Sequence, residues 1–161
     1  MGRRAELLAD RIEQGAAGLA AFAEKLTDAE WKTPMSGGND RRPVGVIVNH
    51  VAFVYPIEID LAKGIASGKA VDVTWEVVAD LNSKHATDTA ATPKAETIAL
   101  LRKNAGEAAA AVRAFTDEML DNAAPFGLAY GAPVTAQFVL EDHPVRHSWH
   151  HLAKIRKALG R

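Results

Sequence analysis

The sequence predicts an all-α fold, a four-helix bundle, on three observations. Alanine is abundant, and the Val/Ile/Thr alternation that is typical of strands is scarce. Four long segments carry apolar residues three or four positions apart, which is the spacing of one helix face. Stretches rich in proline and glycine separate these segments. Because amphipathic helices bury their apolar faces by packing against one another, we expect the four to form a bundle.

The first two long helices are expected at residues 3–26 and 43–67. Pro43 can open the second of them, because the first position of a helix needs no N–H donor. Between them, a capping-box pattern predicts a short helical turn that carries Trp31. Residues 32–42 are expected to form a loop, because they hold proline, glycine and asparagine.

The last two long helices are expected at residues 92–119 and 134–159. Thr92 is placed to act as the N-cap of the third helix, with Pro93 at its first position. Residues 121–133 are rich in proline and glycine and are expected to form a loop.

The connection between the second and third helices is long enough for a crossover from one end of the bundle to the other. Within it, residues 75–82 are expected to form a short helix, followed by a polar tail over residues 83–89. No repeat or second domain is apparent, so we expect one domain over residues 1–161.

Composition excludes several classes of function. The chain carries 19 basic and 20 acidic residues, and without a basic excess we expect no nucleic-acid partner. It has no cysteine, which excludes disulfides, thiolate metal ligands and a cysteine nucleophile. We expect no membrane partner, because no apolar run approaches the length of a membrane span and no signal core follows the N-terminal arginines. Cytoplasmic residence is the expectation that follows.

Four of the six histidines lie within nine residues of the fourth predicted helix. His143, His147 and His151 are four positions apart and therefore share one helix face. Apolar residues such as Val139 and Ile155 continue the same face on both sides. The imidazoles therefore interrupt a stripe that faces the core. Imidazole is also the commonest side-chain ligand of metal ions.

Spacing selects a ligand set from these histidines. His150 is turned about 100° away from His151 on a helical wheel. His143 precedes Pro144, where we expect the helix to be distorted. His147 and His151 remain as a pair, and a third ligand has to come from another helix. His50 lies on the apolar stripe of the second helix, so we predict a divalent metal ion on His50, His147 and His151 with a position open to water or substrate.

Two interpretations of the cluster stay open at this point. A histidine on an apolar face is often a core residue with one satisfied hydrogen bond, whereas several buried imidazoles are costly unless each finds a partner, and one metal ion would satisfy them all. Other metal sites are disfavoured, because no histidine has Glu three residues before it or four residues after it, and no His-Glu-x-x-His motif occurs.

The arrangement resembles the DinB-like superfamily. Three features carry the resemblance: Val48-Asn49-His50-Val51 early in the second helix, the His147-x3-His151 pair in the fourth, and the amphipathic tail Leu152-Ala153-Lys154-Ile155. The segment that ends at Trp31 is also similar. The superfamily comprises damage-inducible four-helix bundles, thiol-dependent S-transferases and the N-terminal part of mycothiol-dependent maleylpyruvate isomerase. The commoner ending His-Arg-Gly-Gln is replaced here by His151-Leu-Ala-Lys, a departure that concerns the substrate rather than the ligands.

The resemblance implies that the three histidines hold one divalent metal ion, in a homodimer that acts on a small molecule. Three imidazoles suit zinc or nickel first, and iron(II) and copper are also compatible. It implies a metal-dependent transferase or isomerase that activates a low-molecular-weight thiol of the mycothiol or bacillithiol type. Asn82, His85 and His143 are candidates for the rim of the site, although for Asn82 and His85 the favoured expectation is that they cap or line a loop. The alternatives are a metal- or small-molecule-binding stress-response bundle without turnover, and a structural bundle whose histidines only fill the core.

Overall fold

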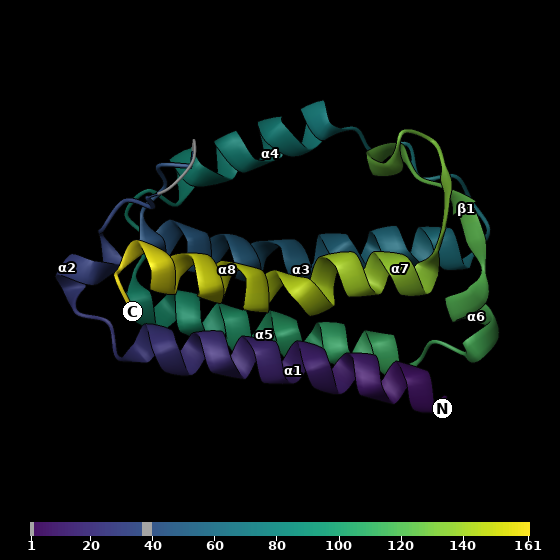
Figure 1. Ribbon diagram of the computed structural model, residues 1–161, viewed down its shortest axis with the longest axis horizontal. Coiled ribbons are helices and arrows are strands. Elements are labelled where there is room, and N and C mark those ends of the chain that lie inside the picture. The colour runs from purple at the N-terminus through teal and green to yellow at the C-terminus, as the bar shows by residue number, and fades with distance from the viewer. Residues whose placement is uncertain (1, 37–39) are drawn as a thin grey trace.

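The computed structural model describes residues 2–36 and 40–161 and confirms the predicted four-helix bundle (Figure 1). Three of the bundle helices are continuous, and the fourth is a rod of two α-helical segments joined by a π-helical one. The rods are α1 (Arg3–Glu24), α3 (Val44–Ala66), α5 (Lys94–Arg113), and the composite of α7 (Ala136–Leu140), η2 (Glu141–Val145) and α8 (Arg146–Ala158).

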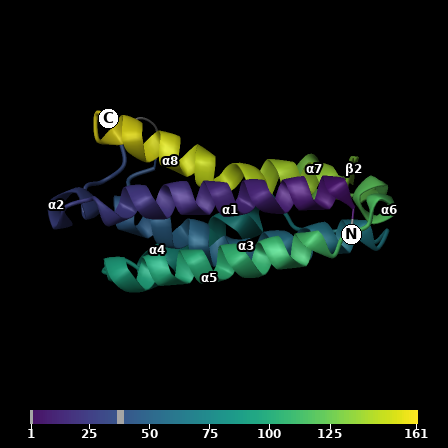
Figure 2. The ribbon, with the colours of Figure 1, turned by 90° about the horizontal axis from the view of Figure 1, so that it is seen from below.

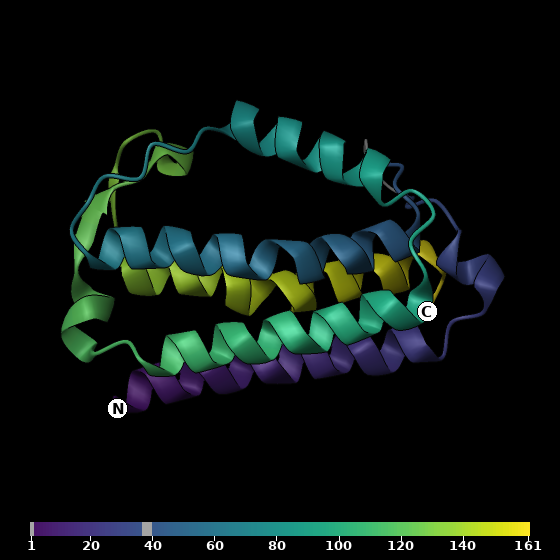
Figure 3. The same ribbon diagram turned by 180° about the vertical axis from the view of Figure 1, so that it is seen from behind.

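The order of the rods around the bundle requires the crossover that the sequence predicts. Helix α1 lies between α5 and α8, with α3 behind it (Figure 2). The hydrogen bonds from Asn49 to Thr97 and from Asn104 to the carbonyl of Ala52 show that α3 and α5 run parallel. Because α3 and α5 are parallel neighbours, the chain has to return along the bundle between them. Helix α4 (Trp75–Asp88) lies in this return, outside α3 (Figures 1 and 3).

The predicted turn around Trp31 is present as helix α2 (Asp28–Trp31) with a complete capping box. Glu30 donates its backbone N–H to the Thr27 hydroxyl, and the Glu30 carboxylate accepts the N–H of Thr27 at 2.8 Å. The Trp31 ring packs against Gly45, where a Cβ atom would lie 2.4 Å from the indole. Of the loop predicted after Trp31, Gly37, Gly38 and Asn39 lie outside the described residues.

Both ends of the third predicted helix differ from expectation. Helix α5 begins at Lys94 with Pro93 as its cap, and the Thr92 hydroxyl bonds Asn49 and Thr97 instead of capping the helix. The helix ends at Arg113, and Thr116 caps a separate helix, α6 (Asp117–Asp121), by accepting the N–H of Met119. The periodicity extends to residue 119, but the threonine hydroxyl competes for the backbone and starts a new turn.

The loop predicted at residues 121–133 contains regular structure. Strand β1 (Ala123–Pro125) pairs with β2 (Pro133–Thr135), and η1 (Gly127–Ala129) lies between them. The crossover is bonded to this hairpin, because Val71 donates to the carbonyl of Pro125 and accepts from the N–H of Gly127. A backbone contact from another part of the chain therefore orders strands too short to give a sequence pattern.

The polar tail predicted over residues 83–89 is wrong, since α4 continues through Asp88. His85 is buried under this helix, where it bonds Asn49 and stacks on Phe53 at a ring distance of 4.7 Å. The tail is helical because this tertiary contact anchors it, whereas its polar composition gives no helical stripe.

Helix α3 corrects one further expectation. By length and composition alone it is able to cross a membrane, although no such run was expected from the sequence. In the bundle, 72% of its most apolar window is buried, as the central helix of a helical core requires.

Candidate metal centre

The structure brings together the three histidines that the sequence selects. His50 comes from α3, and His147 and His151 lie one turn apart on α8, which packs antiparallel to α3. The Nε2 atoms of His50 and His147 are 3.2 Å apart, and one nitrogen from each of the three rings lies within 4.8 Å of the others. Two ring nitrogens at 3.2 Å have to share a proton or face a common cation. Three imidazoles at these distances can therefore hold one metal ion.

Burial keeps two of these rings in the form that binds metal. It lowers the pKa of His50 to about 2, and the neighbouring His147 lowers that pKa further. Burial and the same neighbour also depress the pKa of His151. Both rings are therefore neutral near pH 7, as a metal ligand has to be. Their Nδ1 atoms are buried without a hydrogen-bond partner in the part of the chain that the structure describes.

A buried carboxylate that the sequence analysis missed holds the third ring. The Glu58 carboxylate accepts a hydrogen bond from Nδ1–H of His147. This bond assigns the proton to Nδ1, so the lone pair of His147 is on Nε2, the atom that faces His50. His50, Val54 and Glu58 are four residues apart on α3, and this stripe was the available signal. Glu58 has no histidine three residues after it or four residues before it, so it belongs to none of the metal-binding motifs excluded above.

The other clustered histidines take different places. His143 is outside the group of three; its Nδ1 lies 3.9 Å from Glu58, and its ring stands edge-on to Phe126. It belongs to the π-helical segment η2 with Pro144, which confirms the predicted distortion, since proline has no N–H to continue the α-helical bonding. His150 is exposed, in keeping with its expected direction.

A cavity of about 240 Å³ opens beside the three histidines. Its polar side comes from η2 and α8, including His143 and Arg146. Apolar side chains from α3, α4 and η1 form the opposite wall: Val54, Ile57, Leu61, Trp75, Val78, Leu81 and Leu128. Helix α4, of which the sequence predicts only residues 75–82, is therefore a wall of the site. A small molecule with an apolar part can bind here with its polar end at the histidines.

The predicted rim residues divide into two groups. Asn82 and His143 line the cavity, as expected. His85 lies behind it, and its Nε2–H donates to the Asn49 side chain at 2.9 Å. Asn49 in turn donates to Thr92 and to Thr97 on α5. His85 therefore ties α4 to the bundle at a ring distance of 5.8 Å from His50.

Comparison with known protein families identifies the superfamily of the chain. The family model of the DinB superfamily matches residues 11–155. The chain belongs to the DinB superfamily. A comparison with curated proteins gave no match.

Solved structures share the fold of this DinB-superfamily chain. One is YfiT from Bacillus subtilis, a probable metal-dependent hydrolase with an unusual four-helix bundle topology. Its sequence is 22% identical to this chain, the TM-score is 0.76, and the match covers 99% of this chain and 90% of YfiT. Mycothiol-dependent maleylpyruvate isomerase is 15% identical with a TM-score of 0.68, and the match covers 96% of this chain and 63% of the isomerase. A histidine-to-alanine mutant of the isomerase gives the same values. At these identities the likeness shows the fold.

Proposed function

We propose that this protein binds one divalent metal ion on His50, His147 and His151 and transfers the thiol of a small molecule to an electrophile. The observation that carries the proposal is the convergence of three imidazoles beside a cavity, a set that leaves a coordination position for an external ligand. When bound, the ion would act as a Lewis acid that lowers the pKa of a thiol or of water. Three imidazoles suit zinc or nickel, and iron(II) is also compatible.

The protein's own residues position the reactants. Glu58 holds His147 with its Nε2 toward the other ligands. The apolar wall of α3 and α4 can receive the carbon skeleton of an electrophile. His143 and Arg146 on the polar side can donate hydrogen bonds to a developing negative charge.

The thiol has to come from solution, because the chain has no cysteine. A thiol such as mycothiol or bacillithiol fits this requirement, and the mycothiol-dependent isomerase with the same fold supports it. The same site could bind metal or a small molecule without turnover, which is the alternative. Cytoplasmic residence, the homodimer and the absence of nucleic-acid partners remain predictions.

Metal analysis and thiol consumption test the proposal together. Purified protein is expected to contain close to one equivalent of divalent metal and to accelerate the loss of a low-molecular-weight thiol in the presence of a haloaromatic electrophile. A chelator should abolish both. His147→Ala should lose the metal, whereas His150→Ala, which removes an exposed imidazole at the edge of the cavity that is not one of the three ligands, should keep it. Metal that persists in His147→Ala would refute the ligand set, and metal without thiol consumption would favour the binding protein.

A further inference from the structure

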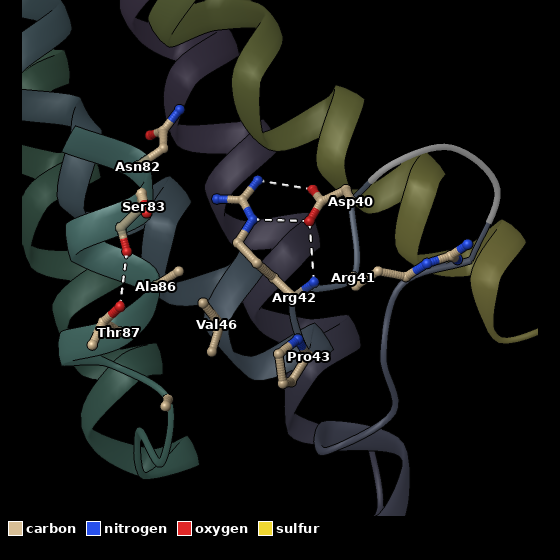
Figure 4. A pocket seen from close by; sticks show the side chains of 10 residues that line it. Asp40, Arg41, Arg42, Pro43, Val46, Asn82, Ser83, Ala86 and Thr87 are labelled. Carbon is tan, nitrogen blue, oxygen red and sulfur yellow. Dashed lines mark hydrogen bonds and ion pairs between the residues drawn. The ribbon is translucent and has the colours of Figure 1, made fainter. Parts of the chain in front are cut away.

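A second cavity adjoins the one at the histidines. It measures about 530 Å³ and lies between the segment 40–43 and helix α4 (Figure 4). Asn82 lines both cavities. Val46 also lines the second cavity and precedes His50 by one helical turn, about 6 Å along the axis of α3. A molecule with one end at His50 could therefore extend past Asn82 into this space.

Arg42 presents an unused donor at this cavity. Its Nε and Nη2 bind the Asp40 carboxylate at 3.0 and 2.8 Å, and its backbone N–H donates to the same carboxylate at 3.1 Å. The remaining nitrogen, Nη1, is buried and has no hydrogen-bond partner among the residues described. Figure 4 shows this nitrogen on the side of the guanidinium that faces α4, away from Asp40. Asp40 thus fixes the guanidinium with one donor aimed across the cavity.

The opposite wall and the local charge suit an anion. Asn82 and Ser83 of α4 face Arg42 across the cavity (Figure 4). A guanidinium keeps its charge at any pH at which the protein is folded. The ion pair with Asp40 engages only Nε and Nη2, so Nη1 is the guanidinium donor left for a bound anion.

We propose that Arg42 binds an anionic group, a carboxylate or a phosphate, on the small molecule whose reacting end lies at His50, His147 and His151. The inference rests on the proposed function for that reacting end and adds a substrate class to it. Nη1 donates to one oxygen of the anion, and the amide of Asn82 is within the same cavity to orient the group. A neutral amide in place of the anion loses this charge-assisted bond. Either the thiol or the electrophile can carry it.

Cobalt-loaded protein provides a direct test, because cobalt–sulfur absorption reports thiol binding. Wild type, Arg42→Gln and the control Arg41→Gln are titrated with mercaptopropionate and mercaptobutyrate and with the corresponding amides. Arg41 is adjacent, equally charged and also at the edge of this cavity, but its side chain is exposed and points away from α4, so that its charge is not aimed at Asn82 (Figure 4). Wild type and Arg41→Gln should bind one of the carboxylates roughly 10- to 100-fold more tightly than its amide, and Arg42→Gln should lose this preference. Cobalt content should be the same in all three.

A second arm locates the anion on the electrophile. A neutral thiol, mercaptoethanol, is combined with a haloalkyl carboxylate or its amide, and the KM values are compared in the same three proteins. A preference for the carboxylate in this arm that Arg42→Gln removes would assign the anion to the electrophile. The inference would be overturned if wild type showed the same affinity and the same KM for carboxylate and amide, or if a preference for the carboxylate survived in Arg42→Gln. Either result would leave the proposed function in place.

Two further measurements separate a failure of the proposed function, or of a variant to fold, from a failure of the anion site. If cobalt binds but no thiol does, the proposed thiol chemistry fails. In that case inorganic phosphate is titrated onto the metal-free protein while the NMR signal of the Arg42 side chain is followed. A signal that does not move would overturn the anion site as well. If Arg42→Gln does not fold, Arg42→Lys is used, because it keeps the charge beside Asp40 but removes the planar fork of donors that leaves Nη1 free. The preference for the carboxylate should then fall, and a preference equal to that of wild type would contradict the inference.

Discussion

Glu58 and His147 form a buried hydrogen bond that joins α3 to α8. Through it, one carboxylate sets both the proton position and the direction of a ring whose other nitrogen lies 3.2 Å from His50. A carboxylate behind a ligand histidine also raises the basicity of that ligand. Glu58 is thus a positioning residue for the candidate metal centre.

Glu58→Gln is expected to weaken metal affinity roughly 10- to 100-fold, because the amide keeps the shape of the side chain but loses the charge that orients His147. Competition with a chromophoric chelator measures the change. Asp60→Asn is the matched control, since Asp60 is an exposed acid on the same helix that faces Lys63. Equal metal affinities in Glu58→Gln and wild type would remove Glu58 from the site.

The metal-free protein is expected to lose stability as the pH falls below about 6.5. Burial depresses the folded-state pKa of His50 to about 2 and also depresses that of His151. The unfolded chain, with ordinary histidine pKa values, therefore binds more protons in this range, and acid favours unfolding. The free energy of unfolding should fall by up to about 1.4 kcal/mol per pH unit for each ring.

Chemical denaturation of chelator-treated protein between about pH 7 and about pH 5 measures this slope. His50→Gln should reduce it, because one of the two buried rings is gone. A slope that is the same in the variant and in wild type would show that His50 does not titrate on unfolding.

Asn49→Ala is expected to destabilise the protein by about 1–3 kcal/mol, because it leaves the buried Nε2–H of His85 without its acceptor and removes the amide donor to Thr92 and Thr97. It should also loosen α4, which amide hydrogen exchange would show as faster exchange over Trp75–Asp88. Asn82→Ala is the control, since Asn82 is only half-buried and should change stability by less than about 0.5 kcal/mol. Unchanged exchange in Asn49→Ala would mean that α4 is held elsewhere.

Two glycine-to-alanine changes should have opposite signs. Gly45→Ala would place a Cβ atom 2.4 Å from the buried Trp31 ring, so we expect a net loss of stability of about 1–3 kcal/mol despite the better helix propensity. Gly106→Ala in α5 meets nothing within 4 Å and should stabilise the protein by about 0.5–1 kcal/mol. Thermal unfolding of both variants measures the difference. Stabilisation by Gly45→Ala would show that Trp31 can move aside.

The helices were predictable where one face of a segment carries a regular pattern. The capping box of Thr27 and Glu30, the pairing of His147 with His151 and the distortion at Pro144 follow from residues within one or two turns of each other. Helix propensity, capping and side-chain direction are local properties, so a single sequence contains them. His50 was predictable as the third ligand because it is a polar residue within an apolar stripe of the second helix.

Features that depend on another part of the chain were not predictable in this way. Helix α4 continues to Asp88 because His85 meets Asn49 and Phe53, and the hairpin of β1 and β2 is ordered by its contact with Val71. Glu58 could not be predicted as part of the site because its partner, His147, lies on a different helix. The orientation of the free Arg42 donor depends on the Asp40 carboxylate, and the cavity that it faces exists only in the folded chain.

The sequence by itself determined four amphipathic helices and the two imidazoles that share a face of the last one. Only the tertiary structure decided that α3 lies antiparallel to α8 at a depth that brings His50 to that pair, with Glu58 behind it. The physical reason is that helical periodicity fixes which side chains share a face, whereas the neighbour of that face depends on packing and on the path of the crossover.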